Sequence, residues 1–234
     1  MMLIERINQK NEKMNMKNYI YNTLKENILY FNLKPGKKLK KSDLIKEFNV
    51  SRTPIREAFA KLAEENLINI YPQRGSFVSL IDFNSVENFK FVRESLEISN
   101  IKKTCEMVTQ KDLFELQTNI EMQEMCLKRD DHICFYKYDN EFHKTLFSCS
   151  GRADIWRIIN KSSMDLNRMR ILSLKSNFNR PDVLSDHKEI LEAVKTKHVK
   201  NSEKAMKDHM DRIVFDTEKM LDDYKSYFRL NKSR

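Results

Sequence analysis

Three observations predict a mainly α-helical protein that contains one small β-hairpin. The 234 residues include only 3 glycines and 4 prolines, so few positions interrupt a helix. Apolar residues recur at helical spacing through most of the chain, and only residues 67–80 have the composition of paired strands. Hydrophobic residues make up 40% of the chain and charged residues 33%, which suits packed cores and argues against disorder.

The first 80 residues predict three helices followed by a hairpin, after a polar tail at 1–16. Ser42 is expected to cap the second helix, and Pro54 fits the first turn of the third, where a missing N–H costs nothing. This order of elements is typical of a winged helix-turn-helix, so we predict a DNA-binding domain at 17–80. The expected elements are helices at 17–32, after Ser42 and at about 53–65, and strands at 67–71 and 77–80.

The rest of the chain predicts an antiparallel all-α bundle. Residues 81–85 are expected to form a linker, with Ser85 capping the next helix, and residues 86–230 to form the helical domain. The expected helices lie near 86–106, 111–128, 131–149, 152–175, 183–197 and 201–228.

Charge and cysteine content limit the class of protein. The net charge of +9 and the pI of about 9.2 favour a polyanionic partner, although surplus lysines also occur on ordinary solvated surfaces. No two cysteines have metal or redox spacing, so we expect Cys105, Cys126, Cys134 and Cys149 to be reduced and mostly buried. No stretch is apolar and long enough for a signal peptide or a membrane span, and a cytoplasmic protein is therefore expected.

Two arginines stand four residues apart at the entrance of the predicted third helix. Arg52 and Arg56 share one side of that helix, away from its apolar stripe, and Thr53 lies beside them. Arginine at this end of the second helix of a helix-turn-helix can bind guanine O6 and N7 in the major groove. The alternative is a pair of surface charges bonded to Glu47, Glu57 or another acidic residue.

The predicted hairpin turn adds a second candidate contact with DNA. Arg74 and Gly75 lie at its tip, where glycine allows close approach of the backbone and arginine is attracted to a narrow minor groove.

Four residues in the predicted bundle have the chemistry of a metal site. Asp139 and His143 are four residues apart on one helix, and the apolar neighbours of His187 and His209 place both on inward faces. Imidazoles and a carboxylate suit Zn, Ni, Mn or Fe, and bundle cores commonly hold such sites. The alternative is that each is an ordinary core residue bonded to a neighbour. His132 and His198 lie near helix ends and are expected to be exposed.

The N-terminal motifs resemble those of a known family. They are similar to the DNA-binding domain of the GntR family of bacterial transcription regulators, in its FadR-type subgroup. The resemblance implies a dimeric regulator of a palindromic operator, with Arg52, Thr53, Arg56 and Gly75 at positions that contact DNA. The motifs that carry it are Val50-Ser51-Arg52-Thr53-Pro54-Ile55-Arg56-Glu57-Ala58 and Arg74-Gly75-Ser76-Phe77-Val78.

The C-terminal half resembles the FCD ligand-binding domain of the same subgroup. Its metal-binding members carry Asp-x-x-x-His followed by two single histidines, and this pattern falls on Asp139, His143, His187 and His209. The resemblance implies one divalent metal per chain, with Zn expected first and Ni, Mn or Fe as alternatives. It also places Arg93 opposite an effector carboxylate. From the residues alone, Arg93 could instead pair with Glu97 on a solvated face.

The combined prediction is a homodimeric, ligand-responsive transcriptional repressor. A small carboxylate would bind at the metal, and Arg168 or Arg170 could also face that pocket. The alternatives are a metal-sensing regulator and a regulator whose metal is purely structural. An enzyme is disfavoured because no His-Glu-x-x-His pattern and no obvious general base accompany the candidate ligands.

Overall fold

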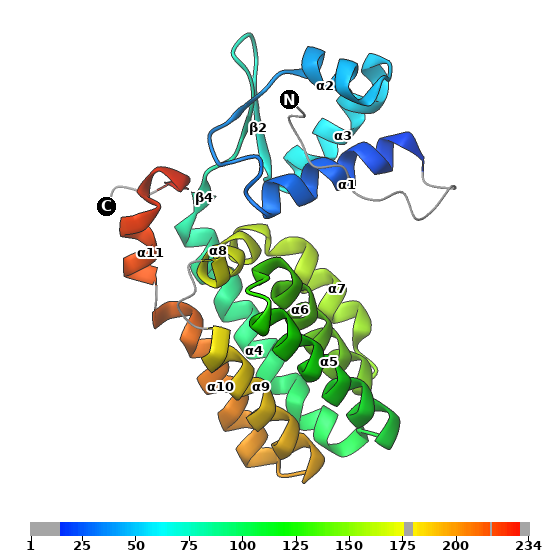
Figure 1. The fold of residues 1–234 in the computed structure, drawn as a ribbon, viewed down its shortest axis with the longest axis vertical. Coiled ribbons are helices and arrows are strands. Elements are labelled where there is room, and N and C mark those ends of the chain that lie inside the picture. Colours follow the sequence, from blue (N-terminus) through cyan, green and yellow to red (C-terminus); the bar gives the residue numbers. More distant parts are fainter. Residues whose placement is uncertain (1–14, 176–179, 216, 230–234) are drawn as a thin grey trace. The chain divides into compact units, whose positions relative to one another are not determined.

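The computed structural model describes residues 15–175, 180–215 and 217–229, without the side chains of residues 213–218. The chain forms two compact units, which are coloured along the sequence in Figure 1. The first contains residues up to Phe83 together with the end of the chain from Tyr224, and the second contains Asn84–Asp223. The expected helical domain at 86–230 therefore differs from the observed second unit at its C-terminal end.

The first unit contains the three expected helices: α1 (Met16–Leu29), α2 (Lys41–Phe48) and α3 (Arg52–Glu64). Helices α1 and α3 pack through fully buried residues that follow helical spacing. Burial of each such Ile, Leu or Phe stabilises the fold by about 1.5–3 kcal/mol. The residues of this core are Ile20, Leu24 and Ile28 on α1 and Ile55, Phe59 and Leu62 on α3.

The start of α2 differs from the expectation. Lys40 is the N-cap, and Ser42 lies inside the first turn, where its hydroxyl donates to Asp43 Oδ1 at 3.1 Å. Capping by Ser42 was therefore wrong. The end of α2 explains the tight connection to α3, because Asn49 adopts a left-handed conformation with φ of 53°.

A three-stranded antiparallel sheet completes the winged domain. Its strands β1 (Lys38–Leu39), β2 (Ile68–Tyr71) and β3 (Gly75–Val78) lie in the order β1-β3-β2. The hairpin of β2 and β3 was expected, and its last pair joins Tyr71 to Gly75. Strand β1 was missed because two residues cannot show an alternating pattern.

The end of the chain returns to this unit. Strand β5 (Phe228–Arg229) pairs in parallel with β4 (Ile81–Asp82), and the 3₁₀ turn Lys225–Tyr227 precedes it. The Tyr227 ring stacks on Phe31, with centroids 5.8 Å apart and planes 12° apart. The expectation of one helix over 201–228 was therefore wrong at its end.

The second unit is an all-α bundle, which confirms the predicted fold class. Figure 1 shows α5 and α6 side by side, and α9 beside α10. None of the helices described is both long and apolar enough to cross a bilayer. Its helices are α4 (Phe83–Met107), α5 (Gln110–Lys128), α6 (His132–Cys149), α7 (Ala153–Ser162), α8 (Met164–Lys175), α9 (Arg180–Lys195), α10 (Val199–Phe215) and α11 (Thr217–Asp223).

Three helix boundaries in this unit differ from the prediction. Helix α4 already begins at Phe83, so Ser85 does not cap it. The helix expected at 152–175 breaks at Ser163, whose hydroxyl donates to Ile159 O at 2.7 Å and so competes with the helical pattern. Pro181 does not break α9 but lies in its first turn, where proline removes no helical bond.

Two of the cysteines differ from the expectation of reduced thiols. Cys126 and Cys134 are joined by a disulfide, with their Cα atoms 5.6 Å apart. The short turn between α5 and α6 brings them together, and their separation of eight residues resembles no common redox motif. The other two, Cys105 and Cys149, are free and buried, as expected.

Candidate metal centre and nucleic-acid interface

The four candidate ligands converge in the core of the second unit. Asp139 and His143 come from α6, His187 from α9 and His209 from α10, and all four side chains are buried. One possible ligand atom from each lies within 4.8 Å of the others. The packing of three helices therefore brings together residues that are up to 70 positions apart in sequence.

The environment of His187 determines which ring nitrogen carries the proton. Gln123 donates through Nε2 to Asn119 Oδ1 at 2.8 Å, so its Oε1 is the atom that faces His187. Oε1 lies 2.7 Å from His187 Nδ1 and can only accept, which places the hydrogen on Nδ1. The other nitrogen, Nε2, is left with a lone pair, and it is buried without a hydrogen-bond partner in the described structure.

The remaining two histidines have the same arrangement, with a carboxylate beside Nδ1. Glu97 Oε1 lies 2.9 Å from His143 Nδ1, but the two atoms are not aligned for a hydrogen bond. Asp186 Oδ2 lies 3.4 Å from His209 Nδ1. With hydrogens on both Nδ1 atoms, the two Nε2 lone pairs face each other across 3.2 Å.

This set of atoms fits a metal ion. Three imidazole lone pairs and a carboxylate directed at one point repel one another unless a cation lies among them. Histidines that bind metal usually give their second ring nitrogen to a carboxylate or an amide oxygen. His187 and His209 do so here, and His143 Nδ1 lies beside the Glu97 carboxylate without a hydrogen bond to it.

The pKa values of the histidines favour the neutral, metal-binding form. Burial lowers the pKa of His187 well below its usual value, and His209 and His143 lower it further. Burial also lowers the pKa of His143, assisted by Arg93. Burial lowers the pKa of His209 too, although Asp186 opposes the shift. Neutral imidazoles keep the lone pairs that a metal requires.

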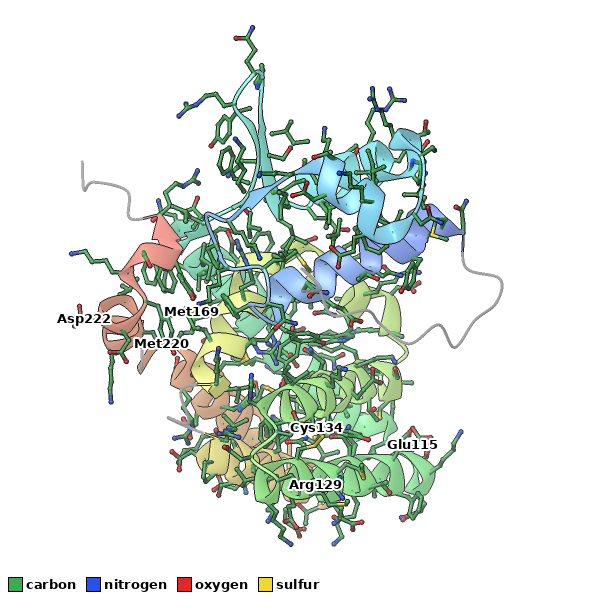
Figure 2. The ribbon with its side chains drawn as sticks, turned by 45° about the horizontal axis from the view of Figure 1, so that its top comes forward. Glu115, Arg129, Cys134, Met169, Met220 and Asp222 are labelled. Atoms are coloured by element: carbon green, nitrogen blue, oxygen red, sulfur yellow. A yellow bond between two sulfur atoms is a disulfide. The ribbon has the colours of Figure 1, made fainter. Side chains whose placement is uncertain are left out.

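A small cavity adjoins these residues. Asp139 and His209 form part of its wall, and so does Met169, which is labelled in Figure 2. The cavity is lined by Asp139, Met169, Arg170, Ser173, Leu174, Val183, His209 and Arg212.

Arg170 is the arginine of α8 that faces this cavity. Its guanidinium contacts Asp139 Oδ2 and donates to Asn140 Oδ1 at 3.0 Å. Burial, reinforced by Arg93, lowers the pKa of Arg170 to about 9, so it remains charged at neutral pH. Arg168 is fully buried and pairs with Asp165, and it does not line the cavity.

Arg93 is buried rather than solvated. It donates from Nε to Glu97 Oε1 at 3.1 Å and lies over the Trp156 ring, 5.2 Å from the ring centre. Arg93 does pair with Glu97, as the alternative proposed. The solvated face of that alternative is wrong, because Arg93 is only 2% exposed. Its Nη2 is buried without a partner among the described atoms, although Arg93 is not part of the cavity lining.

The candidate DNA-reading residues lie on the surface at the start of α3. Arg52, Thr53 and Arg56 are exposed, and neither arginine forms an ion pair with any described residue. The alternative partner Glu57 pairs instead with Lys17 at 3.3 Å. The N-cap Ser51 makes no side-chain bond to the helix, so the first N–H groups of α3 stay available to an anion. These residues border a hollow between α2 and α3 that is lined by Lys41, Ser42, Ile45, Lys46, Arg52, Thr53, Ile55 and Arg56.

The tip of the hairpin also lies on the surface. Arg74 is exposed, with its guanidinium 5.8 Å from the centre of the Tyr71 ring. Gly75 has a φ of 111°, and a Cβ at this position would lie 3.0 Å from Lys38 Cε. The hairpin itself therefore requires glycine at this position, whether or not DNA approaches it.

Sequence reasoning missed the three residues whose oxygens lie beside the histidine Nδ1 atoms. Glu97 and Gln123 belong to helices that carry no candidate ligand, and only tertiary packing brings them to the site. Asp186 precedes His187 directly but serves His209 instead, and it also accepts two bonds from Arg212 at 2.7 and 2.6 Å. No sequence spacing reports such partners.

Comparison with known proteins gives two family matches. Residues 16–78 match the model described as bacterial regulatory proteins, gntR family, and residues 91–212 match the FCD domain. The HTH-type transcriptional repressor RspR of Escherichia coli K12 is 31% identical over 194 residues, which cover 83% of this chain and 85% of that protein. An uncharacterised HTH-type regulator of Streptomyces ambofaciens is 33% identical over 197 residues, covering 84% of this chain and 82% of that protein.

Solved structures support the same fold. Escherichia coli McbR/YncC superposes with a TM-score of 0.74 at 20% identity, over 90% of this chain and 99% of that chain. A GntR regulator from Rhodococcus sp. RHA1, described as putative, gives 0.72 at 19% identity, over 89% of this chain and 98% of that chain.

Proposed function

The chain belongs to the GntR family of bacterial regulatory proteins and carries an FCD domain, and we propose that a small organic acid bound beside a metal ion controls its affinity for operator DNA. It is a DNA-binding transcriptional regulator, and its relatives and fold are those of regulators rather than enzymes. The metal, the acid, the dimer and repression are parts of the proposal. Repression is suggested by the relative RspR, which is described as a repressor.

The observation that carries the metal site is the common direction of three imidazole nitrogens. His143, His187 and His209 each have Nδ1 beside an oxygen of another residue, and each directs Nε2 to the same point as Asp139. A divalent metal bound by these four residues would supply a positive centre that attracts a carboxylate. Zn is the first expectation, with Ni, Mn or Fe as alternatives.

The acid would bind in the cavity beside this centre. Arg170 and Arg212 line the cavity, so a second anionic group there would find guanidinium donors. The buried, unpaired Nη2 of Arg93 supports a further role in balancing that charge. Because both the acid and Asp139 can bind Arg170, entry of the acid would compete with an existing ion pair.

The surface at the start of α3 is the part of the protein that would bind the operator. We assign Arg52, Thr53 and Arg56 to the major groove and Arg74 and Gly75 to the minor groove or the phosphates. A homodimer would place two such surfaces on a palindromic operator. The acid changes operator affinity only if it binds the two arrangements of the dimer differently, and such coupling is typically about 1–3 kcal/mol.

A measurement of metal content tests the proposed metal site directly. The purified protein is expected to contain about one divalent metal per chain, and His187→Ala is expected to lose most of it because one of four donors is removed. His198→Ala is the matched control, since His198 is exposed and lies outside the cluster. Full metal occupancy in His187→Ala would exclude His187 from the site.

Measuring release of the operator distinguishes control by an organic acid from control by the metal concentration. Metal-loaded protein should release its operator on addition of a small carboxylic acid, and Arg170→Ala should weaken that response. Release that follows metal concentration without any acid would favour a metal sensor instead. Loss of folding on chelation would favour a purely structural metal.

A further inference from the structure

We propose that the Cys126–Cys134 disulfide is a reversible redox site that controls the metal affinity of the second unit. The effect on metal affinity rests on the proposed function, whereas the redox chemistry of the two cysteines does not depend on it. The bridge joins the last turn of α5 to the first turn of α6, next to the helical segments that build the candidate metal centre.

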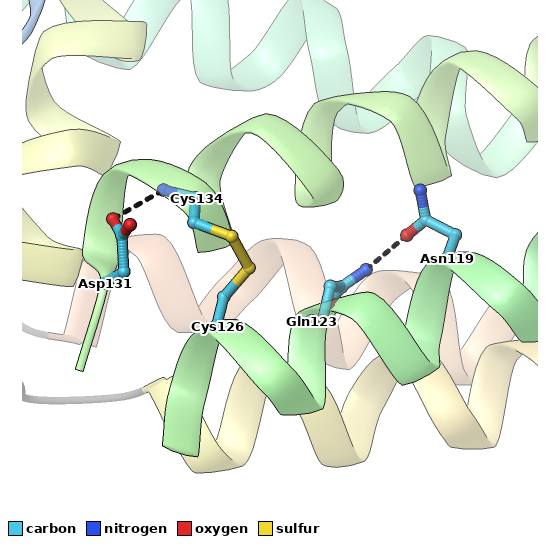
Figure 3. The surroundings of a disulfide bond; sticks show 5 residues. All are labelled: Asn119, Gln123, Cys126, Asp131 and Cys134. Atoms are coloured by element: carbon cyan, nitrogen blue, oxygen red, sulfur yellow. Dashed lines mark hydrogen bonds between the residues drawn. A yellow bond between two sulfur atoms is a disulfide. The ribbon is translucent and has the colours of Figure 1, made fainter. Parts of the chain in front are cut away.

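The position of the two sulfur atoms suits stepwise exchange. Cys134 is partly exposed in the first turn of α6, whereas Cys126 is 1% exposed at the end of α5. Figure 2 labels Cys134 and the exposed Arg129 of the intervening turn. Asp131 caps α6 by accepting from the Cys134 N–H at 2.9 Å, as Figure 3 shows. The start of a helix favours a thiolate, so Cys134 is the sulfur that reacts first.

The chemistry requires a low-molecular-weight disulfide as the oxidant. The Cys134 thiolate attacks one sulfur of that disulfide, which forms a mixed disulfide and releases one small thiolate. Cys126 then loses its proton to solvent and attacks the Cys134 sulfur, which releases the second small thiolate. Two protein thiols are oxidised and one small disulfide is reduced to two thiols. A small dithiol reverses both steps.

The bridge is coupled to the metal centre through both of its helices. On α5, Gln123 lies one turn before Cys126 and holds Nδ1 of His187 at 2.7 Å. Figure 3 shows Gln123, its bond to Asn119 and the bridge on the same stretch of α5. On α6, Cys134 is followed on the same rigid helix by Asp139 and His143.

Breaking the bridge removes the covalent restraint between the end of α5 and the start of α6, so that only side-chain packing and the short turn between them fix their relative position. The amide that sets the proton position of His187 would then be less fixed relative to the two ligands on α6. Loss of such a positioning partner typically weakens metal binding by about 10–100-fold, and we expect about tenfold here because Gln123 remains present.

The other two cysteines provide an internal control. Cys105 is buried against the Ser202 hydroxyl at 3.1 Å, and burial raises its pKa. Burial, assisted by Asp112, raises the pKa of Cys149 to about 12. Both therefore remain thiols, which are poor nucleophiles at neutral pH.

The first test counts thiols in the full-length protein after two treatments. One sample is equilibrated with oxidised glutathione, and the other is reduced with a phosphine that is then removed by anaerobic gel filtration. Both are alkylated under denaturing conditions and analysed by peptide mass spectrometry. Alkylation is expected at all four cysteines of the reduced sample, but only at Cys105 and Cys149 of the oxidised sample. Alkylation of Cys126 and Cys134 in both samples would overturn the redox site.

The second test measures zinc affinity by competition with a chelating dye. The reduced protein should bind zinc about tenfold more weakly than the oxidised protein. A double variant, Cys126→Ser with Cys134→Ser, should bind like the reduced protein after either treatment, which also excludes direct binding of zinc by the freed thiols. The control Cys149→Ser should keep the full difference between the two samples.

The outcomes distinguish this inference from the proposed function. Equal zinc affinity in both samples, with the bridge formed in one, would overturn the coupling and leave the metal site standing. Absence of zinc binding in both samples would overturn the metal site and the coupling together, while the thiol count would still decide the redox site.

Discussion

At the scale of single residues, hydrogen positions decide what the histidine cluster can do. Gln123 is held by Asn119 so that its oxygen faces His187, and this fixes the free nitrogen of His187 toward Asp139. A side chain outside the proposed ligand set therefore sets the hydrogen position of a proposed metal ligand. The candidate DNA-reading arginines show the opposite case, since their chemistry depends on the absence of ion pairs with the described residues around them.

The role of Gln123 leads to a prediction. Gln123→Met keeps the length of the side chain but removes the oxygen that accepts from His187, so metal affinity should fall by about 10–100-fold. Zinc competition measures the change. Gln117→Met is a suitable control on the same helix, because Gln117 is exposed and bonds only to Glu121 among the residues described. Unchanged affinity in Gln123→Met would remove Gln123 from the centre.

Base reading by Arg56 leads to a second prediction. Selection from random duplexes should give a defined site for the unchanged protein and a relaxed site for Arg56→Ala, because a bidentate contact with guanine provides about 1–3 kcal/mol of discrimination. The control Lys46→Ala changes an exposed lysine at the same hollow. It should weaken binding to all sequences alike and reduce the salt dependence. Equal weakening on every duplex by Arg56→Ala would make Arg56 a phosphate contact.

At the scale of elements, local backbone geometry sets the shape of the wing. The hairpin of β2 and β3 turns through Gln73, with a φ of 60°, and Gly75, with a φ of 111°. The φ of Gly75 lies in a region that side chains with a Cβ rarely adopt, and Lys38 crowds the same point. The form of the wing thus depends on one glycine, and its charge on the neighbouring Arg74.

Substitution of this glycine should loosen the hairpin. Gly75→Ala is expected to cost the hairpin about 1–2 kcal/mol, which would speed amide hydrogen exchange in β2 and β3 about 5–30-fold. Gly151→Ala is a control, because Gly151 has a φ of 74° but no atom within 4 Å of the added Cβ. Its effect should be smaller and confined to the turn before α7. Unchanged exchange in the hairpin of Gly75→Ala would contradict the expected backbone strain at this φ.

At the scale of the whole molecule, the chain end links the two units covalently a second time. The chain enters the second unit at α4, next to β4, and leaves it after α11 to form β5 against β4. Phe228 is buried in this small sheet, and Tyr227 stacks on Phe31 of the first unit. The first unit is therefore completed by residues that follow the helical unit in sequence.

Removal of this contact should expose the edge of β4. Phe228→Ala is expected to cost the local structure about 2 kcal/mol, because a buried aromatic side chain is replaced by a methyl group at the margin of a core. Hydrogen exchange of the amides of β4 and β5 measures this loss. Arg229→Ala should change it little, since its ion pair with Asp82 is exposed. Unchanged protection in Phe228→Ala would show that β5 is held by its backbone bonds alone.

The sequence by itself determined the three N-terminal helices, the hairpin and the helical character of the second unit, together with the residue chemistry of the two candidate sites. Helical spacing and the scarcity of glycine and proline predicted the helices, the hairpin and the bundle, because these signals act over neighbouring residues. Helix spacing also predicted that Asp139, His143, His187 and His209 point inward, and the structure brings them together, while their role as ligands is our proposal.

Tertiary structure alone decided the partners of those residues and the unexpected pairings. Glu97 and Gln123 reach the histidines, Arg170 rather than Arg168 faces the cavity, and Cys126 meets Cys134 only through the packing of helices. Strand β5 likewise pairs with β4, although Asp82 and Arg229 are 147 residues apart in sequence. Such contacts join residues whose spacing carries no periodic signal, because their meeting depends on the sum of many packing interactions and not on any local pattern.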